Sequence, residues 1–212
     1  MTTIIGSGFR ASLQGQTRRA AEWLVGPLAH TGITPNGLTM LGFALSVVAG
    51  LVLASQALVP GGLLVLLAGA FDMLDGALAR VKNQKTPFGA FLDSTLDRYS
   101  EAAVFLGLQV AFLRDADPDW LSLSGVVLCL LVLVGSLMIS YTRARAEGLG
   151  LDCEVGWLQR PERILALGIG LLLPRQLLLA VLAALALLTH VTVLQRIAHV
   201  RRLTTATNTP GG

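Results

Sequence analysis

The sequence predicts an all-α membrane protein with six transmembrane helices and an N-terminal amphipathic helix in the membrane interface. Hydrophobic residues make up 53% of the 212 residues and charged residues only 14%, against about 25% charged residues in typical soluble domains. Apolar residues occur in runs of roughly 20, the length of a helix that crosses the hydrocarbon core. Basic residues gather at one set of ends of these runs, which is typical of the cytoplasmic side of a membrane protein.

The first element we expect is an amphipathic helix over residues 9–29, within an N-terminal segment of residues 1–31. Phe9 and Trp23 are on its apolar side, whereas Arg19 is on its polar side. A helix of this kind lies in the plane of the interface. The segment has no long apolar core, so we predict no cleavable signal peptide.

Six apolar segments follow within residues 32–203, and we predict that each forms a transmembrane helix. They are residues 36–59, 61–81, 88–113, 120–143, 161–173 and 176–200. The fifth is short, so hydropathy defines its ends least well. The polar tail of residues 204–212 contains Gly and Pro and is expected to be disordered.

The basic residues predict a multi-pass protein of the cell membrane with both termini and the functional site on the cytoplasmic side. With the N-terminus inside, fourteen of the sixteen Lys and Arg residues lie on inner segments or inner helix ends, and only Arg114 and Arg175 lie outside. This is a strong positive-inside pattern. It also argues against a nucleic-acid-binding role, because the basic residues are spread over loops without the interleaved aromatic side chains that stack bases.

Four aspartates lie in predicted transmembrane segments, where charged residues are costly and usually functional. Asp72 and Asp75 are three residues apart near the inner end of the second segment, and Asp93 and Asp97 are four apart near the inner start of the third. Each pair therefore shares a helix face. The short turn of residues 82–87 makes the two helices antiparallel, so we expect the four carboxylates to converge at one depth.

Four converging carboxylates repel one another and predict a bound cation. Oxygen-only ligands suit Mg²⁺, Mn²⁺ or Ca²⁺, and no set of Cys and His residues competes for zinc. Two Mg²⁺ or Mn²⁺ ions bridged by shared carboxylates would fit a phosphoryl-type displacement. Arg80 is eight residues after Asp72, roughly on the same face, and its guanidinium suits a phosphate. Cys129 and Cys153 are interpreted as unpaired structural residues.

The aspartates and their small neighbours resemble a known signature. The residues Asp72, Asp75, Gly76, Ala79, Arg80, Gly89, Asp93 and Asp97 match in type and spacing the eight fixed positions of the CDP-alcohol phosphatidyltransferases. The six-helix plan with an interfacial helix is also similar, so the resemblance covers most of the chain. It implies a homodimeric enzyme that takes CDP-diacylglycerol from the membrane, transfers its phosphatidyl group to the hydroxyl of an alcohol and releases CMP.

The resemblance also implies roles for individual residues. Asp72, Asp75, Asp93 and Asp97 would hold the metal ions, and Asp97 would also act as the general base. Donor binding would involve the start of the first segment, the second segment and the turn: Asn36, Gly37, Leu38, Thr39, Gly76, Arg80 and Thr86. Glu101, one turn after Asp97, either supports the site from behind its ligands or serves helix packing, and the packing interpretation is preferred.

A cluster of arginines at the inner ends of the last three segments indicates a phosphate on the acceptor. The pattern is similar to that of the bacterial phosphatidylinositol-phosphate synthases, whose acceptor is inositol 1-phosphate. In that resemblance the acceptor would be bound by Ser140, Arg143, Arg145, Arg163 and Arg196. Residues 152–159 depart from the glycine-rich sequence of those enzymes, and glycerol 3-phosphate remains the main alternative acceptor. A CDP-archaeol donor is also compatible with the sequence.

Two non-enzymatic functions compete with group transfer. A cation channel or transporter would use the carboxylates as an ion pathway, but it predicts acidic residues distributed through the membrane depth, whereas those here crowd on one side. A scaffold with a structural metal, that is, a pseudoenzyme, is disfavoured by the intact general-base position Asp97.

Overall fold

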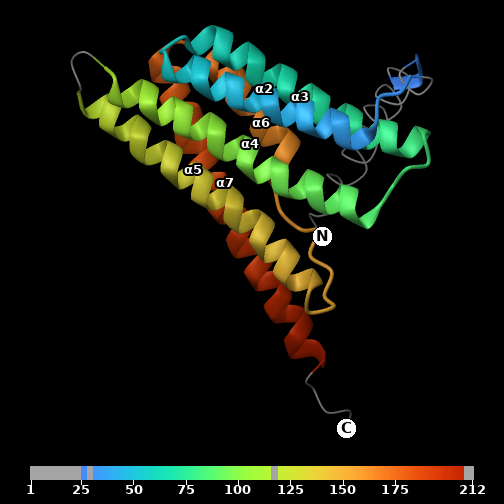
Figure 1. Cartoon of the computed structure of the whole chain (residues 1–212). Helices are drawn as coiled ribbons and strands as arrows, with labels where there is room; N and C mark the ends of the chain where they lie inside the picture. The colour runs from blue at the N-terminus through green and yellow to red at the C-terminus, as the bar shows by residue number, and fades with distance from the viewer. Residues whose placement is uncertain (1–24, 28–30, 116–118, 208–212) are drawn as a thin grey trace. The chain divides into compact units, whose positions relative to one another are not determined.

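The computed structural model describes residues 25–27, 31–115 and 119–207. Within these ranges the chain forms helices and no strand (Figure 1). The helices are α2 (Pro35–Ala54), α3 (Leu58–Val81), α4 (Pro87–Leu113), α5 (Trp120–Glu147), α6 (Arg160–Leu171) and α7 (Arg175–Thr207). The predicted all-α class is confirmed for the described chain, and each of the six predicted segments corresponds to one helix.

Four of these helices, α2, α3, α5 and α7, are long and apolar enough to cross a membrane, as expected of a multi-pass membrane protein. α4 has at least three charged residues in every stretch of 18, because Asp97, Arg98 and Glu101 lie near its middle. α6 has 12 residues, which span about 18 Å, less than the roughly 30 Å of a hydrocarbon core. The expected count of six transmembrane helices is therefore not confirmed for the described residues.

The largest differences from the predicted helix ends are at the C-termini of α2 and α7. α2 ends at Ala54 rather than at residue 59, because Gln56 adopts a positive φ of 66° and begins a turn. Apolar residues continue on both sides of this turn, so hydropathy does not reveal it. α7 continues to Thr207, so the first residues of the expected disordered tail are helical. The Thr204 hydroxyl donates to the carbonyl of Val200 within that helix.

Two predicted elements fall largely on residues that the structure does not describe. The amphipathic helix expected over residues 9–29 lies outside the described chain, apart from residues 25–27, which are helical. Residues 208–212 of the expected tail lie outside it as well.

The described residues form two compact units. The first contains the described parts of Met1–Leu45 and Leu67–Tyr99, and the second those of Ser46–Leu66 and Ser100–Gly212. The apolar cluster of the first unit consists of Val25, Leu38, Ala77 and Leu78, with Phe71 and Leu74 packed against it. All four aspartates of the signature belong to this first unit.

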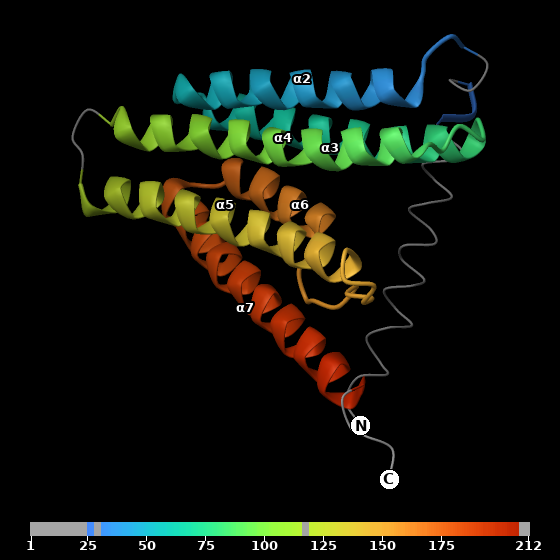
Figure 2. The same cartoon turned by 60° about the horizontal axis from the view of Figure 1, so that its bottom comes forward.

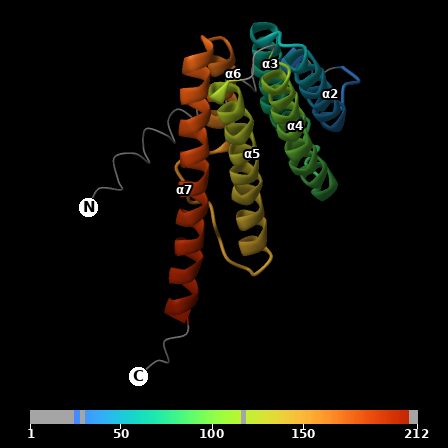
Figure 3. The same cartoon turned by 90° about the vertical axis from the view of Figure 1, so that its left-hand side faces the viewer.

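The second unit has a larger apolar core, to which all six helices contribute buried side chains. α5 packs along α7, and α6 also contacts α7 (Figures 2 and 3). On α5, Gly135 lies against the side chain of Thr189 on α7, where a Cβ atom would overlap with it. A small residue there lets the two helices approach closely.

The second unit also contains a backbone-to-backbone contact between α2 and α4. A Cβ atom built on Gly50 would overlap with the carbonyl oxygen of Ala103, and one on Gly107 would overlap with the backbone of Gly50. Neither obstacle is a side chain that can rotate away. Two glycines thus determine how closely these helices pack, as small residues do in membrane proteins.

We predict that Gly50→Ala destabilises the protein by about 1–3 kcal/mol, the usual cost of adding a methylene to a packed interior. Gly42→Ala on the same helix is the matched control, because a Cβ atom there would make ordinary van der Waals contact with Phe71 at 3.6 Å. Thermal unfolding of the purified proteins in detergent measures the difference. Equal melting temperatures for the two variants would contradict the close contact.

Candidate active site

The turn between α3 and α4 brings the aspartate-bearing ends of the two helices together within the first unit. Asn83 adopts a left-handed conformation with φ 57°, which asparagine tolerates better than most residues. The backbone N–H of Gln84 donates to the carbonyl of Ala79 at 2.9 Å and closes the end of α3. The Lys82 ammonium donates to the carbonyls of Thr31 at 2.8 Å and Ile33 at 2.7 Å. This lysine therefore ties the turn to the segment that precedes α2.

Three of the four aspartates form one cluster. Asp72 and Asp75 on α3 and Asp93 on α4 each contribute one carboxylate oxygen, and these oxygens lie within 4.8 Å of one another. Asp75 is 5% exposed. The Thr39 hydroxyl on α2 donates to Asp75 Oδ2 at 2.7 Å, so a third helix orients this carboxylate.

The donor set of this cluster fits a hard divalent cation. Three carboxylates at this separation repel one another, and burial of one of them increases the cost of its charge. A cation among them would remove that repulsion. All three ligands are oxygen atoms, which is the set that Mg²⁺ and Mn²⁺ prefer. The residues present are therefore suited to the metal that the sequence predicts.

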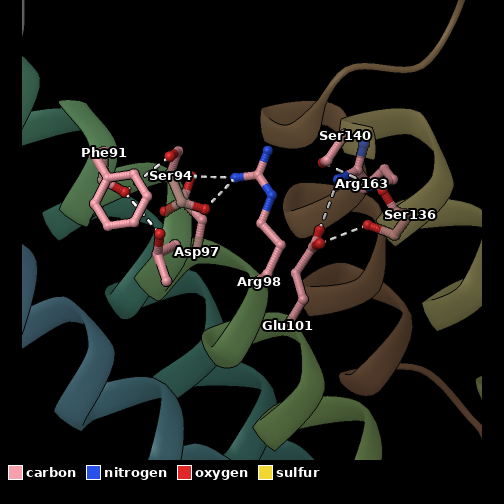
Figure 4. A network of polar contacts seen from close by, with 9 residues as sticks. Phe91, Ser94, Asp97, Arg98, Glu101, Ser136, Ser140 and Arg163 are labelled. Carbon is pink, nitrogen blue, oxygen red and sulfur yellow. Dashed lines mark hydrogen bonds and ion pairs between the residues drawn. The ribbon is translucent and has the colours of Figure 1, made fainter. Parts of the chain in front are cut away.

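Asp97 lies one turn after Asp93 on α4 and is not one of the three clustered carboxylates. It is 8% exposed, and Arg98 Nη1 approaches its Oδ2 to 3.2 Å. The same guanidinium nitrogen donates to the carbonyl of Ser94 at 2.8 Å (Figure 4). Asp97 thus lies outside the three-carboxylate cluster and has Arg98 as a charged partner.

A cavity of about 220 Å³ adjoins the aspartates in the first unit. Its lining residues are Pro35, Asn36, Thr39, Asp75, Gly76, Ala79, Arg80, Gln84, Lys85, Thr86, Gly89, Ala90 and Asp93. Five of the seven predicted donor-binding residues are in this lining. Gln84 and Lys85 were not predicted; their position in the polar turn was the available signal.

Gly37 and Leu38, the other two predicted donor-binding residues, do not line the cavity. The backbone N–H of Gly37 donates to Thr34 Oγ1 at 3.1 Å, an N-terminal capping contact of α2. Leu38 is 4% exposed and belongs to the apolar cluster of the first unit. Residues 36–39 occupy one helical turn, so they point in different directions. Only Asn36 and Thr39 point toward the cavity.

At two positions of the cavity lining, Gly76 and Gly89, no side chain projects into the cavity. A Cβ atom on Gly89 would come within 3.0 Å of Thr86 Oγ1 and 3.2 Å of Asn36 Oδ1, the polar atoms of two lining residues. At Gly76 the nearest atom to a Cβ would be Arg80 Nη1, at 3.6 Å, so the arginine head lies over this glycine. Small residues of this kind let a ligand approach the backbone.

The predicted acceptor-binding residues belong to the second unit. Ser140, Arg143 and Arg145 lie near the end of α5, and Ser140 Oγ donates to the carbonyl of Ser136 at 3.3 Å. The exposed side chain of Arg143 forms ion pairs with Glu147 at 2.7 Å and with Glu154 at 2.9 Å. Arg145 is exposed in the last turn of the helix.

Arg163 and Arg196 are both buried. Arg163, on α6, is 5% exposed and pairs with Glu101 at 2.8 Å (Figure 4). Arg196, on α7, is 6% exposed and donates through Nε to the carbonyl of Val155 at 3.0 Å and through Nη1 to that of Ile139. At least two nitrogen atoms of Arg196 therefore donate hydrogen bonds to backbone carbonyls, a role that the sequence did not reveal.

A polar stripe on α7 holds the loop between α5 and α6 by its backbone. Besides Arg196, the stripe comprises Thr192, which accepts from Leu158 N at 3.3 Å, Gln195, which accepts from Trp157 N at 3.2 Å, and His199, whose Nε2 is 3.2 Å from the carbonyl of Asp152. The spacing of three, four and seven residues places these side chains on one helix face. This explains why polar residues interrupt the apolar sequence of α7.

Residues 32–206 match the family model of the CDP-alcohol phosphatidyltransferases. The chain belongs to this family. Phosphatidylinositol phosphate synthase from Mycobacteroides abscessus is 42% identical to this phosphatidyltransferase over 189 residues, which cover 84% of this chain and 82% of the relative. Archaetidylinositol phosphate synthase from Methanothermobacter thermautotrophicus is 35% identical over 194 residues, or 89% of this chain and 94% of the relative.

The fold of this phosphatidyltransferase is similar to crystal structures of phosphatidylinositol phosphate synthase from Mycobacterium tuberculosis, which is 35% identical. The form with CDP-DAG bound gives a TM-score of 0.76, covering 86% of this chain and 94% of that one. The form in complex with manganese and citrate gives 0.73, covering 87% and 88%. Manganese in the relative and the aspartate cluster here together support the use of a divalent metal ion.

We predict that Thr39→Val lowers the affinity of this phosphatidyltransferase for Mn²⁺ by about 10–100-fold, the usual effect of losing a partner that orients a metal ligand. Valine keeps the shape of threonine but cannot donate to Asp75. Titration calorimetry of the purified protein with Mn²⁺ measures the change, and Thr39→Ser is the matched control because it retains the hydroxyl. Unchanged affinity in Thr39→Val would show that the hydrogen bond does not orient the carboxylate for metal.

Proposed function

We propose that this enzyme transfers the phosphatidyl group of CDP-diacylglycerol to the hydroxyl of inositol 1-phosphate, giving phosphatidylinositol phosphate and CMP. The observation that carries the proposal is the identity of 42% with a phosphatidylinositol phosphate synthase over most of both chains. The three-carboxylate cluster beside a cavity lined by Arg80 and Lys85 supports it independently, because a metal site next to cationic side chains suits a pyrophosphate substrate.

The donor occupies the cavity of the first unit in this proposal. Asn36, Thr86, Gly76 and Arg80 contact the CDP group, and Arg80 pairs with its pyrophosphate. Gln84 and Lys85 extend this set, since both line the same cavity. Gly37 and Leu38 support the helix turn that presents Asn36. A Lys ammonium close to a pyrophosphate adds a further positive charge.

Two Mg²⁺ or Mn²⁺ ions, when bound, neutralise the negative charge of the pyrophosphate and of the departing CMP. Asp72, Asp75 and Asp93 hold them, and Thr39 orients Asp75. Asp97 completes the set of four carboxylates. The relative's manganese complex supports a divalent ion.

The reaction requires a base for the acceptor hydroxyl, and we assign this role to Asp97. The hydroxyl oxygen forms a bond to the β-phosphorus, the bond from that phosphorus to the bridging oxygen breaks, and CMP leaves with the bonding electrons. Asp97 accepts the hydroxyl proton. Its position outside the three-carboxylate cluster supports an assignment distinct from theirs.

The acceptor binds through Ser140, Arg143, Arg145, Arg163 and Arg196, because guanidinium groups recognise phosphate through paired hydrogen bonds. The two relatives named above differ in the lipid part of their names and share inositol phosphate. This shared inositol phosphate group favours inositol 1-phosphate over glycerol 3-phosphate as the acceptor of this enzyme. Arg196 would bind the acceptor phosphate and also hold the loop between α5 and α6 through the carbonyl of Val155.

The basic residues support an orientation with the N-terminus, the catalytic residues and the C-terminus on the cytoplasmic side. In this arrangement an interfacial helix within residues 1–31 precedes a catalytic domain of residues 32–203. The diacyl chains of the donor stay in the bilayer while the reacting phosphate meets the cytoplasm.

We expect the purified enzyme with CDP-diacylglycerol and Mg²⁺ or Mn²⁺ to release CMP on addition of inositol 1-phosphate. Glycerol 3-phosphate, inositol and serine serve as parallel acceptors, and chelation of the metal by EDTA should stop the reaction. CMP release is measured by chromatography. If only glycerol 3-phosphate supports CMP release, inositol phosphate is excluded as the acceptor. If none of the alcohols tested supports CMP release, the transferase function is excluded.

Asp97→Asn should lower turnover by about 10²–10⁴-fold, the usual contribution of a general base, because an amide cannot accept the hydroxyl proton. Binding of CDP-diacylglycerol should change little. Initial rates at saturating substrate and donor binding by calorimetry measure the two effects. Asp152→Asn, an exposed loop variant, is the matched control and should turn over normally. Wild-type turnover in Asp97→Asn would remove this residue as the base.

A further inference from the structure

Glu101, on α4, is at the centre of a buried polar network in the second unit (Figure 4). Its Oε1 accepts from Arg163 Nη2 on α6 at 2.8 Å, and its Oε2 accepts from the Ser136 hydroxyl on α5 at 2.5 Å. The exposed fractions are 8% for Glu101, 5% for Arg163 and 0% for Ser136. Three helices therefore each contribute one polar side chain to a point inside the apolar core.

Simple packing does not account for this network. An ion pair that is removed from water loses hydration that its mutual attraction restores only in part, and well-packed apolar residues are often more stabilising in the same place. In addition, Arg163 Nε is buried and has no hydrogen-bond partner within the described chain. A buried donor without an acceptor is destabilising. The guanidinium of Arg163 is thus buried with only part of its hydrogen-bonding capacity used within the described chain.

Glu101 restrains the guanidinium of Arg163 but accepts a hydrogen bond from only one of its nitrogen atoms. Within the described chain, only Nη2 of Arg163 has a hydrogen-bond partner. A guanidinium has five N–H donors in a rigid plane, so one anchored nitrogen orients the others. Ser136 in turn holds the second oxygen of Glu101, so the carboxylate cannot rotate away.

The network is also adjacent to a proposed acceptor contact. Ser140 lies one helical turn after Ser136 on α5, and its hydroxyl donates to the Ser136 carbonyl. Residues four apart share a helix face. Ser136 and Ser140 therefore lie on one side of α5. Arg163 of α6, which Glu101 contacts, lies near that side (Figure 4).

We propose that Glu101 and Ser136 are positioning residues that hold the guanidinium of Arg163 for the phosphate of the acceptor. This inference rests on the proposed function, in which Arg163 binds that phosphate. Glu101 touches neither substrate and acts through Arg163. In this proposal the phosphate oxygens of the acceptor bind nitrogen atoms of Arg163 that Glu101 does not hold.

The test is the dependence of the rate on each substrate in Glu101→Gln. Glutamine has the size of glutamate and still accepts one hydrogen bond, but it lacks the charge that fastens Arg163. We expect the KM for inositol 1-phosphate to rise about tenfold or more, the range for losing a hydrogen bond between charged groups. The KM for CDP-diacylglycerol should stay within about twofold. A purely structural role would reduce the amount of active enzyme and leave both KM values unchanged.

Glu162→Gln is the matched control, because it makes the same chemical change in the residue next to Arg163. Its side chain accepts from the backbone N–H of Gln159 at 2.9 Å in a capping box, a role that glutamine also fills. We expect wild-type KM values for both substrates. Ser136→Ala is a second, milder variant that keeps the ion pair and frees one oxygen of Glu101, and it should raise only the acceptor KM, by a smaller factor.

The wild-type enzyme in the same assay separates the two proposals. If it uses inositol 1-phosphate and neither Glu101→Gln nor Ser136→Ala changes the acceptor KM, the positioning role is overturned and the proposed function stands. If neither inositol 1-phosphate nor glycerol 3-phosphate supports CMP release by the wild-type enzyme, the proposed function fails and the positioning role fails with it. If Glu101→Gln does not fold, the acceptor KM of Ser136→Ala decides.

Discussion

The constraint on which this structure depends is the accommodation of charge inside an apolar helical chain. Three carboxylate oxygens lie within 4.8 Å of one another on α3 and α4, although mutual repulsion and burial both oppose that arrangement. A divalent cation offsets the repulsion, and the short turn between the helices holds the ligands together. Without a metal ion, the repulsion in this candidate active site opposes folding, and such strain is common at functional sites.

Several other charged groups have a protein partner that orients them. Thr39 orients Asp75, Arg98 pairs with Asp97, and Glu101 pairs with Arg163. Thr39 and Arg163 lie on other helices than the carboxylates they contact, whereas Arg98 is the next residue after Asp97 on α4. The same holds for Arg196, whose guanidinium donates to one backbone carbonyl of the loop before α6 and to one of α5. Polar groups in an apolar surrounding are tolerated when they are hydrogen-bonded, and here the partners also determine the direction of each functional side chain.

Close helix packing makes these contacts possible. Gly50 and Gly107 let α2 and α4 meet backbone to backbone in the second unit, and Gly89 leaves space for the polar atoms of Asn36 and Thr86 in the first. In both places the glycine is useful because it lacks a Cβ atom, and its conformational freedom is not required. Short side-chain contacts such as that between Thr39 and Asp75 need helices that lie close together.

The sequence by itself determined the helical class, the family and the four aspartates, because these depend on hydropathy and on fixed spacing along the chain. It did not determine the end of α2 at Ala54, since apolar residues continue through the turn. Nor did it determine that Leu38 packs inward while Thr39 reaches Asp75, or that Glu101, interpreted as packing, pairs with Arg163. Spacing places residues on a helix face, but a partner on another helix depends on how the helices pack. Only the tertiary structure decided which charges meet, because that packing depends on contacts distant in the sequence.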